Sequence, residues 1–179
     1  MRQILEALGE DPGRTGLRDT PKRVAEAYTD LFSGLGVDAS SVLESLPGEH
    51  GQGLILVREI PMTAMCEHHL LPFVGTAALA YLPGEDGRIC GLSKLARVID
   101  VLSRKPTVQE RLVVEAADAL EKALAPRAVF AIVEAEHLCM TMRGAQKPGT
   151  ITVTTEFRGL FRDDPALRAE VLALARGSR

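Results

Sequence analysis

The chain has 179 residues, of which 46% are hydrophobic and 25% are charged. This composition is typical of a globular protein and excludes a disordered chain, and the length suits one compact domain with a small addition. The net charge of −3 argues against a general nucleic-acid surface.

The sequence predicts neither a membrane segment nor a secretory leader. Its apolar runs are far shorter than the ~20 residues that a membrane helix needs. Near the start, Glu6, Glu10 and Asp11 stand where a signal peptide would have its apolar core. We therefore expect a cytoplasmic protein with no membrane partner and no nucleic-acid partner.

The first 36 residues predict helices. Thr20 followed by Pro21 is typical of a helix start, because threonine caps the first turn and proline suits the first helical position. Residues 37–53 are rich in Gly, Ser and Asp and predict a connection. We therefore assign residues 1–53 to an N-terminal helical segment with its connection, and residues 54–179 to the main domain.

From residue 54 onward, the spacing of apolar residues predicts four strands and three helices. The predicted strands are residues 54–60, ended by Pro61, 73–83, 128–140 and 150–157, and the predicted helices are 92–104, 108–124 and 165–176. Strand pairs around a helical pair indicate an α+β fold with an antiparallel four-stranded sheet. Helices on one face leave the other face and the edges exposed, and oligomerisation would cover them.

Cysteine and histidine are concentrated in two clusters, Cys66-Glu67-His68-His69 and His137-Leu138-Cys139. Three cysteines cannot pair completely, and in a reducing compartment cysteines near histidines are more often metal ligands than disulfides. A catalytic zinc site uses three such ligands and keeps an open position for water. The two clusters offer five groups for three positions, which predicts a zinc enzyme with spare histidines.

The spacing within each cluster suggests how the ligands converge. Cys66 and His69, three residues apart, suit a tight turn that closes on one ion. In a strand, His137 and Cys139 would share a face, so either could bind the metal while the other works beside it. Core packing or a structural site is the alternative, but a structural site needs four ligands. Cys90 is interpreted as a buried small hydrophobic residue.

Several basic residues could bind phosphate. Lys94 and Arg97 lie three apart on one predicted helical face, and Ser93 lies near the helix N-terminus, where backbone N–H groups attract anions. Arg143 follows the second cluster, and Arg23 lies in the first predicted helix. A solvated helix face has the same pattern, so these residues alone do not decide the matter.

The next predicted helix starts with Gln109 and Glu110. Glu110 could simply favour the helix dipole. Alternatively, its carboxylate could accept two N–H bonds from the edge of a guanine base.

Five motifs together resemble those of the GTP cyclohydrolase I family. They are TPKRVAEAY (20–28), CEHHLLPF (66–73), GLSKLARVID (91–100), PxVQERL (106–112) and HLCMTMRG (137–144). The resemblance runs over roughly residues 15–162 and rests on the order and spacing of the motifs. It implies the tunnelling fold, in which sheets of several subunits join into a barrel, and a toroidal homodecamer of two stacked pentamers. It also implies active sites shared between subunits.

The resemblance implies hydrolysis of GTP at guanine C8, release of formate and formation of 7,8-dihydroneopterin triphosphate, the first step of folate and tetrahydrobiopterin-type synthesis. By the same resemblance, Cys66, His69 and Cys139 hold one Zn²⁺ per subunit, and His68 and His137 are catalytic. Histidine suits proton transfer because its unperturbed pKa is about 6.5. His137 would protonate the ring nitrogen, and His68 would assist later transfers near the ribose.

The implied substrate contacts are Gln109 and Glu110 for guanine, and Ser93, Lys94, Arg97, Arg143 and Arg23 for the triphosphate, with Arg23 reaching in from a neighbouring subunit. One position departs from the family pattern. Some members carry a lysine three residues after that last arginine, where this chain has Glu26. A phosphate contact there is lost or replaced.

Two other interpretations fit part of the sequence. A 7-cyano-7-deazaguanine reductase type of enzyme shares the fold but uses a cysteine nucleophile and a nicotinamide cofactor, which leaves five clustered ligand groups without a use. A zinc-stabilised binding or regulatory module would need a closed four-ligand site, and it leaves the guanine and phosphate residues unexplained.

Overall fold

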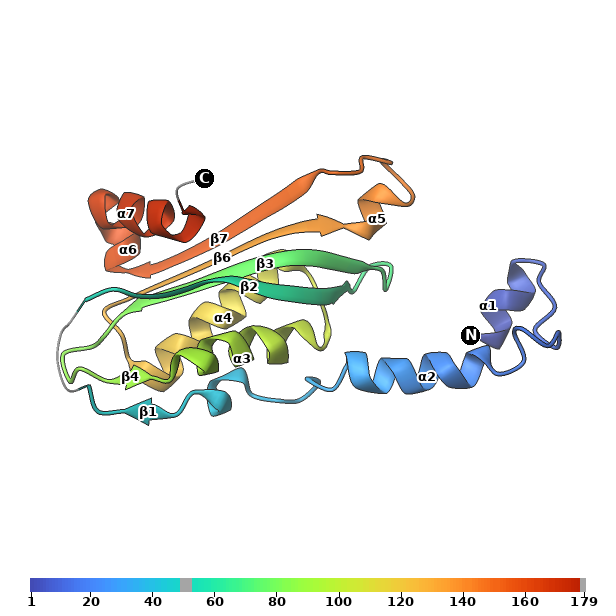
Figure 1. The fold of residues 1–179 in the computed structure, drawn as a ribbon, viewed down its shortest axis with the longest axis horizontal. Coiled ribbons are helices and arrows are strands. Elements are labelled where there is room, and N and C mark those ends of the chain that lie inside the picture. The colour runs from blue at the N-terminus through green and yellow to red at the C-terminus, as the bar shows by residue number, and fades with distance from the viewer. Residues whose placement is uncertain (49–52, 178–179) are drawn as a thin grey trace.

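The computed structural model describes residues 1–48 and 53–177, and its centre is a five-stranded sheet in the order β5-β2-β3-β6-β7 (Figure 1). The strands are β2 (Ile55–Cys66), β3 (Pro72–Leu82), β5 (Pro106–Thr107), β6 (Ala128–His137) and β7 (Ile151–Gly159). The four long strands pair antiparallel, and the two-residue β5 pairs parallel to the end of β2. The predicted α+β fold is confirmed, with β5 as an added edge strand.

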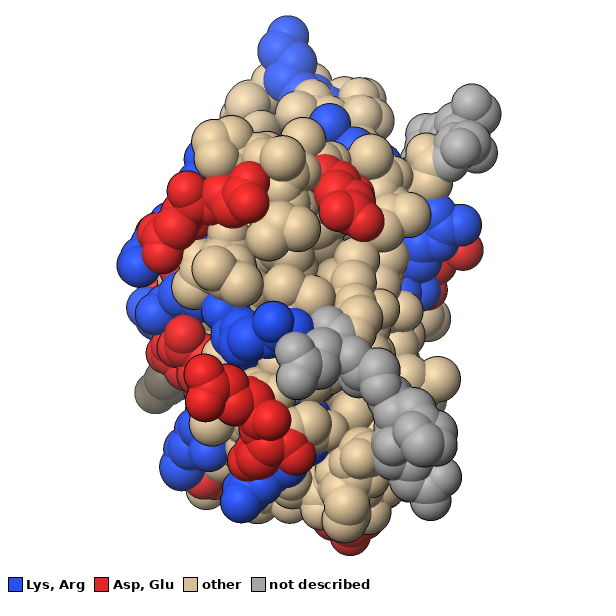
Figure 2. Space-filling view, turned by 90° about the vertical axis from the view of Figure 1, so that its left-hand side faces the viewer, with Lys and Arg blue, Asp and Glu red and all other residues tan. Residues whose placement is uncertain are grey.

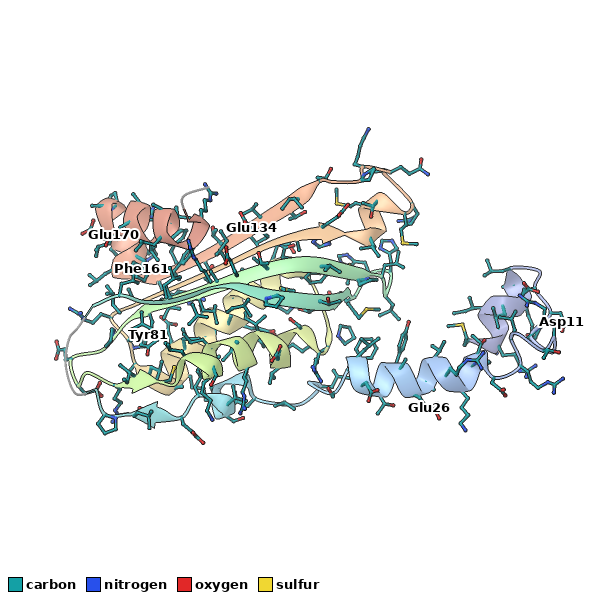
Figure 3. The ribbon with its side chains drawn as sticks, viewed as in Figure 1. Asp11, Glu26, Tyr81, Glu134, Phe161 and Glu170 are labelled. Atoms are coloured by element: carbon teal, nitrogen blue, oxygen red, sulfur yellow. The ribbon has the colours of Figure 1, made fainter. Side chains whose placement is uncertain are left out.

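Two helices cover one face of this sheet, α3 (Leu92–Ser103) and α4 (Gln109–Leu124). Each presents an apolar stripe, and Leu95 of α3 and Leu112 of α4 are fully buried. Tyr81 of β3 lies between the sheet and this helical layer (Figure 3). Burying one such leucine contributes about 1.5–3 kcal/mol, so the repeated apolar spacing is what attaches the helical pair to the sheet.

The opposite face is partly covered, contrary to our expectation that it would be exposed. It carries α6 (Leu160–Asp163) and α7 (Pro165–Arg176) over one end. Phe161 and Val171 are buried there against Phe130 and Ile132 of β6, and Figure 3 shows Phe161 between the sheet and α7. The sequence predicts α7 correctly but gives no sign that its apolar face folds back onto the sheet.

The N-terminal part consists of two helices that project away from the sheet, α1 (Arg2–Ala7) and α2 (Thr20–Leu31) (Figure 1). The predicted connection is partly ordered: η1 (Ala39–Val42) packs on α3 and α4, and β1 (Ser45–Leu46) pairs with β4 (Ile89–Cys90). Residues 49–52 of that connection lie outside the described residues. The helices are confirmed, and the division of the chain at residue 53 stays a prediction.

Two predicted boundaries are wrong. Pro61 does not end β2, because the strand continues to Cys66. Proline lacks an N–H and is tolerated at a strand edge, and β2 pairs with β5 at Met65 and Cys66, beyond Pro61. The strand predicted over 128–140 ends at His137, where the helical turn α5 (Leu138–Thr141) begins.

Among residues 1–48 and 53–177, no helix combines the length and the hydropathy that a membrane crossing requires.

Candidate active site

The first cluster lies in a tight turn between β2 and β3. Cys66, the last residue of β2, donates its N–H to the carbonyl of Leu71 at 2.9 Å, and its own carbonyl accepts from the N–H of Leu70 at 2.9 Å. Leu70 has a positive φ of 51°, a conformation that costs a non-glycine residue of order 1–3 kcal/mol. This is the tight turn that the spacing of Cys66 and His69 predicted, and it brings His69 back toward Cys66.

The second cluster reaches the first through α5. Because β6 ends at His137 and a helical turn follows, Cys139 is not on a shared strand face with His137. It instead meets the β2–β3 turn, and the ligand atoms of Cys66, His69 and Cys139 all lie within 4.8 Å of one another. Elsewhere among the described residues, no other group of three metal-binding side chains meets this criterion.

The donor set fits zinc. Tetrahedral zinc, with Zn–S of about 2.3 Å and Zn–N of about 2.0 Å, separates its ligand atoms by about 3.5–3.8 Å, so small side-chain shifts suffice. Burial raises the pKa of the Cys139 thiol, and the adjacent Cys66 raises it further. Two thiols forced together in this way are favourable as a cation site, because a divalent ion stabilises both thiolates.

His68 and His137, the other histidines of the two sequence clusters, are close to the metal group but outside it. The rings of His68 and His69 are edge-on, with centroids 6.4 Å apart, and His69 alone of the two joins the metal group. His137 stacks on Phe73, its partner across the β3–β6 ladder, with centroids 4.7 Å apart and an interplanar angle of 7°. Burial lowers the pKa of His137, and the nearby Glu110 opposes that shift.

The start of α4 lies beside His137. The side chain of Gln109 is 0% exposed, and its Oε1 is 2.7 Å from His137 Nε2. Glu110, the next residue, is exposed, so its carboxylate is free to meet a ligand from solvent. The predicted guanine residues are therefore next to the metal cluster, although the two of them face different surroundings.

Two arginines join the surroundings of the metal group. Arg111 of α4 binds Glu67 of the turn through two N–H···O contacts of 2.5 and 3.1 Å, which lower the pKa of Glu67. Arg143 lies 3.1 Å from Nε2 of His69. The sequence predicts the proximity of Arg143, but no local pattern indicated that Glu67 and Arg111 would pair, because 44 residues separate them.

We call this region the metal end of the sheet; it comprises Cys66, His68, His69, Gln109, Glu110, His137, Cys139 and Arg143.

The remaining predicted phosphate residues at the start of α3 lie far from the metal end. Cys90, just before α3, donates its N–H to the hydroxyl of Tyr81 at 3.0 Å. Tyr81 is eight residues along β3 from Phe73, which stacks on His137, so about 26 Å of strand separates the two places. Figure 1 accordingly shows the start of α3 and the β2–β3 turn at opposite ends of the sheet.

We call the start of α3, with Ser93, Lys94 and Arg97, the basic end. Ser93 and Arg97 are exposed there, and Lys94 forms an ion pair of 3.0 Å with Glu44. Arg97 also lines a hollow of about 280 Å³ between α3 and the chain around Gly34. Figure 2 shows the face seen from the end opposite the metal cluster, where basic and acidic side chains are interspersed.

Arg23 belongs to neither end. It lies on the projecting α2 and donates to Gly16 O at 3.3 Å and Thr20 Oγ1 at 3.0 Å. Glu26, one turn further along the same exposed helix, is 3.8 Å from Lys22 and points away from the sheet (Figure 3). Among the described residues, no hydrogen bond or ion pair joins Lys22 or Arg23 of α2 to the metal end.

Cys90 is buried as expected, and burial raises the pKa of its thiol.

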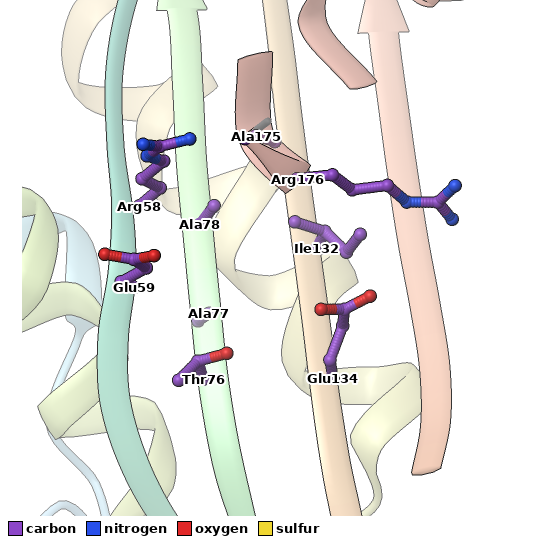
Figure 4. A pocket seen from close by; sticks show the side chains of 10 residues that line it. Arg58, Glu59, Thr76, Ala77, Ala78, Ile132, Glu134, Ala175 and Arg176 are labelled. Carbon is purple, nitrogen blue, oxygen red and sulfur yellow. The ribbon is translucent and has the colours of Figure 1, made fainter. Parts of the chain in front are cut away.

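A separate polar hollow of about 120 Å³ lies on the face of the sheet that carries α7. Its charged residues are Arg58 and Glu59 of β2, Glu134 of β6 and Arg176 of α7 (Figure 4). Arg58 of β2 donates a hydrogen bond of 3.1 Å to the carbonyl of Leu174, which connects β2 with α7. Both charge signs are present, and none of these residues belongs to the metal end.

The fold and the Cys–His–Cys group together define the class of protein: a tunnelling-fold chain with a candidate metal centre. A structural relative is the archaeosine synthase QueF-Like in its apo form, with a TM-score of 0.50 and 13% identity over 62% of this chain and 97% of that one. This likeness concerns the fold alone.

Sequence comparison identifies the family. The family model of GTP cyclohydrolase I matches residues 1–176, and the chain belongs to the GTP cyclohydrolase I family. A relative named GTP cyclohydrolase 1 from Caldanaerobacter subterraneus subsp. tengcongensis is 55% identical over 100% of this chain and 95% of its own length. Relatives of the same name from Streptococcus agalactiae serotype V and Mycobacterium ulcerans are 54% and 53% identical, over 96% and 97% of this chain and 91% and 86% of their own lengths.

Proposed function

We propose that the chain hydrolyses GTP at guanine C8, releases formate and forms 7,8-dihydroneopterin triphosphate, the entry step of folate or tetrahydrobiopterin-type synthesis. Membership of the GTP cyclohydrolase I family supports this activity. The observation that carries the site is the convergence of Cys66, His69 and Cys139 beside His137.

Cys66, His69 and Cys139 would hold one Zn²⁺ per subunit. When bound, zinc supplies Lewis-acid chemistry that makes water a usable nucleophile near neutral pH. The Glu67–Arg111 pair attaches the turn that bears Cys66 and His69 to the start of α4. The metal ligands and the guanine site would thereby keep a fixed spacing, which a reaction at one carbon of a bound base requires.

The other residues of the metal end would bind and protonate the base. Glu110 is exposed at the start of α4, and its carboxylate would accept two N–H bonds from the guanine edge. His137 would give a proton to the ring nitrogen, which makes C8 electrophilic. His68 is outside the ligand group and exposed, so it is available for later proton transfers near the ribose.

The complete site would form between subunits of a homodecamer of two stacked pentamers. A bound GTP at the metal end needs cations for its triphosphate, yet α3, which carries Ser93, Lys94 and Arg97, begins beside Tyr81, about 26 Å of strand from the metal end of the same chain. A neighbour's basic end would supply them, with Arg143 from the same chain and Arg23 from a projecting α2. The edge strand β7, with Ile151 and Val153 exposed, offers the surface for joining sheets.

Zinc analysis combined with a GTP incubation tests the proposal. We expect about one zinc per chain and one formate released per GTP consumed, in a cytoplasmic enzyme. Zinc without formate would support a metal-stabilised binding module instead. The absence of both zinc and formate would contradict the proposal.

A further inference from the structure

We propose that Gln109 is a positioning residue that holds His137 in its Nε2–H tautomer, so that Nδ1 is the ring atom that exchanges protons with the substrate. The resemblance to the family implies a different role for Gln109, a direct contact to guanine. The inference concerns the proton chemistry of the proposed function and rests on that function for its substrate, but the tautomer itself follows from the contacts of Gln109.

The orientation of the Gln109 amide is fixed by two backbone carbonyls. Its Nε2 lies 2.9 Å from the carbonyl oxygen of Val133 in β6 and 2.9 Å from that of Thr152 in β7. The amide group has two N–H donors, and both are used in these bonds. A flipped amide would place its oxygen against two carbonyl oxygens at the same distances, so this assignment is the one that the network permits.

The orientation of the Gln109 amide determines which neutral tautomer His137 adopts. With both N–H groups engaged, the atom that faces His137 is Oε1, 2.7 Å from Nε2 of the imidazole. A carbonyl oxygen only accepts, so Nε2 must carry a proton. The neutral tautomer protonated at Nδ1 would place two lone pairs opposite each other at that distance, and the fully buried Gln109 amide, held by two carbonyls, cannot turn away.

The other neighbours of the His137 ring leave its Nδ1 available for proton transfer. Phe73 covers one face of the imidazole. Within the parts of the chain that the structure describes, no protein group forms a hydrogen bond to Nδ1. In the proposed step, the imidazolium gives the Nδ1 proton to the guanine ring nitrogen and becomes the neutral Nε2–H form. Oε1 of Gln109 accepts from Nε2 in both states, so the contact need not break.

Direct guanine binding by Gln109 would require this network to break. The side chain is 0% exposed, and its two N–H groups and its oxygen already have partners in β6, β7 and His137. The exposed neighbour Glu110 can meet the base without such a loss.

Nitrogen-15 solid-state NMR of the zinc-loaded enzyme tests the tautomer directly. The chain has only four histidines, so replacing in turn the three that are not zinc ligands by asparagine assigns the signals. We expect the neutral form of His137 to be protonated at Nε2, with a proton protected from exchange with water. In Gln109→Met, which keeps the length but offers only a weak thioether acceptor, the protection should be lost. Gln109→Glu is the comparison variant: it keeps an oxygen facing Nε2 but places its second oxygen against the carbonyls of Val133 and Thr152, so the protection should be weakened and not abolished.

Kinetics separate positioning from substrate contact. For Gln109→Met with its zinc retained, we expect kcat to fall about 10- to 100-fold while KM for GTP changes less than about threefold. A rise in KM with kcat unchanged would overturn the proposal, and so would a wild-type spectrum with the neutral proton at Nδ1, whether or not the variants fold. If the wild type shows the Nε2–H form but releases no formate from GTP, the proposed function fails and the positioning role stands.

Discussion

At the metal end of the sheet, the functional side chains meet through contacts inside one chain: three ligands converge within 4.8 Å, and Gln109 holds His137. At the basic end, Ser93 and Arg97 are exposed and Lys94 is paired with Glu44, whose side chain is 74% exposed. The contacts of the metal end are therefore complete within one chain. In the proposed enzyme, the exposed cations of the basic end would bind the flexible triphosphate of a GTP held at the metal end of a neighbouring chain.

The largest expected effect separates the two adjacent histidines of the metal end. His69→Ala should lose zinc and lower activity by more than about 1,000-fold, since the metal contributes several kcal/mol to the transition state. His68→Ala is the matched control: it should keep zinc and lose about 100- to 10,000-fold in turnover as a proton-transfer group. Zinc content of the two purified variants decides the assignment. A metal-free His68→Ala beside a zinc-loaded His69→Ala would reverse it.

The next effect concerns base recognition at the metal end. Glu110→Gln should keep zinc but lose about 1.5–3 kcal/mol of guanine binding, because an amide cannot replace a charged acceptor that faces two donors. The measurement is the affinity for GTP relative to ITP, which lacks the exocyclic amine. Unchanged discrimination in this variant would remove Glu110 from guanine recognition.

A smaller effect is expected at the basic end. Lys94→Ala should leave zinc intact and raise KM for GTP about tenfold, or ~1.4 kcal/mol, with a greater loss at low salt than at high salt. Glu44→Gln removes the carboxylate that competes for the same ammonium group. Because Glu44 is largely exposed and its charge is screened by solvent, its removal should lower KM only slightly. A rise in KM for Glu44→Gln would show that the pair supports binding instead.

The smallest effect concerns the Glu67–Arg111 pair and its dependence on pH. Arg111 lowers the pKa of Glu67 in the folded chain, so the pair stabilises the fold above the unfolded pKa of the carboxyl, and this stability is lost as the pH falls through the lowered value. Arg111→Gln should therefore lower the melting temperature slightly at pH 7. Its difference from the wild type should shrink as the pH falls below 4.5, the ordinary value of this group. A difference that stays constant with pH would exclude the ion pair as its cause.

Much of the fold could be predicted from periodic apolar spacing. The helices α3, α4 and α7 follow from stripes that bury residues such as Leu95 and Leu112. The predicted strand boundaries were wrong where tertiary contacts override the local sequence pattern. Pro61 is compatible with an open strand edge, and β6 gives way to α5 at His137 because the chain must turn to bring Cys139 to the metal group.

The residues of the candidate site could be predicted from the sequence, but not how they are divided between the two ends of the sheet. Cysteine and histidine spacing identified the two clusters and predicted the turn that joins Cys66 to His69, whereas the choice of Cys139 over His137 came from the family resemblance. Spacing along the chain could not show that Lys94 and His137 are at opposite ends of the sheet, since that depends on the pairing of strands. Nor could it show that Gln109 is buried and bonded to two neighbouring strands.

Subunit complementation tests most directly whether the metal end of one chain works with the basic end of another. Cys139→Ala destroys only the metal end, and Lys94→Ala combined with Arg97→Ala destroys only the basic end. Differently tagged chains are coexpressed, and mixed oligomers are purified through both tags. In a random mixture, about a quarter of the sites would join two intact ends. We predict formate release from GTP near a quarter of the wild-type rate, far above either variant alone; mixed oligomers no more active than the sum of the two variants would contradict a shared site.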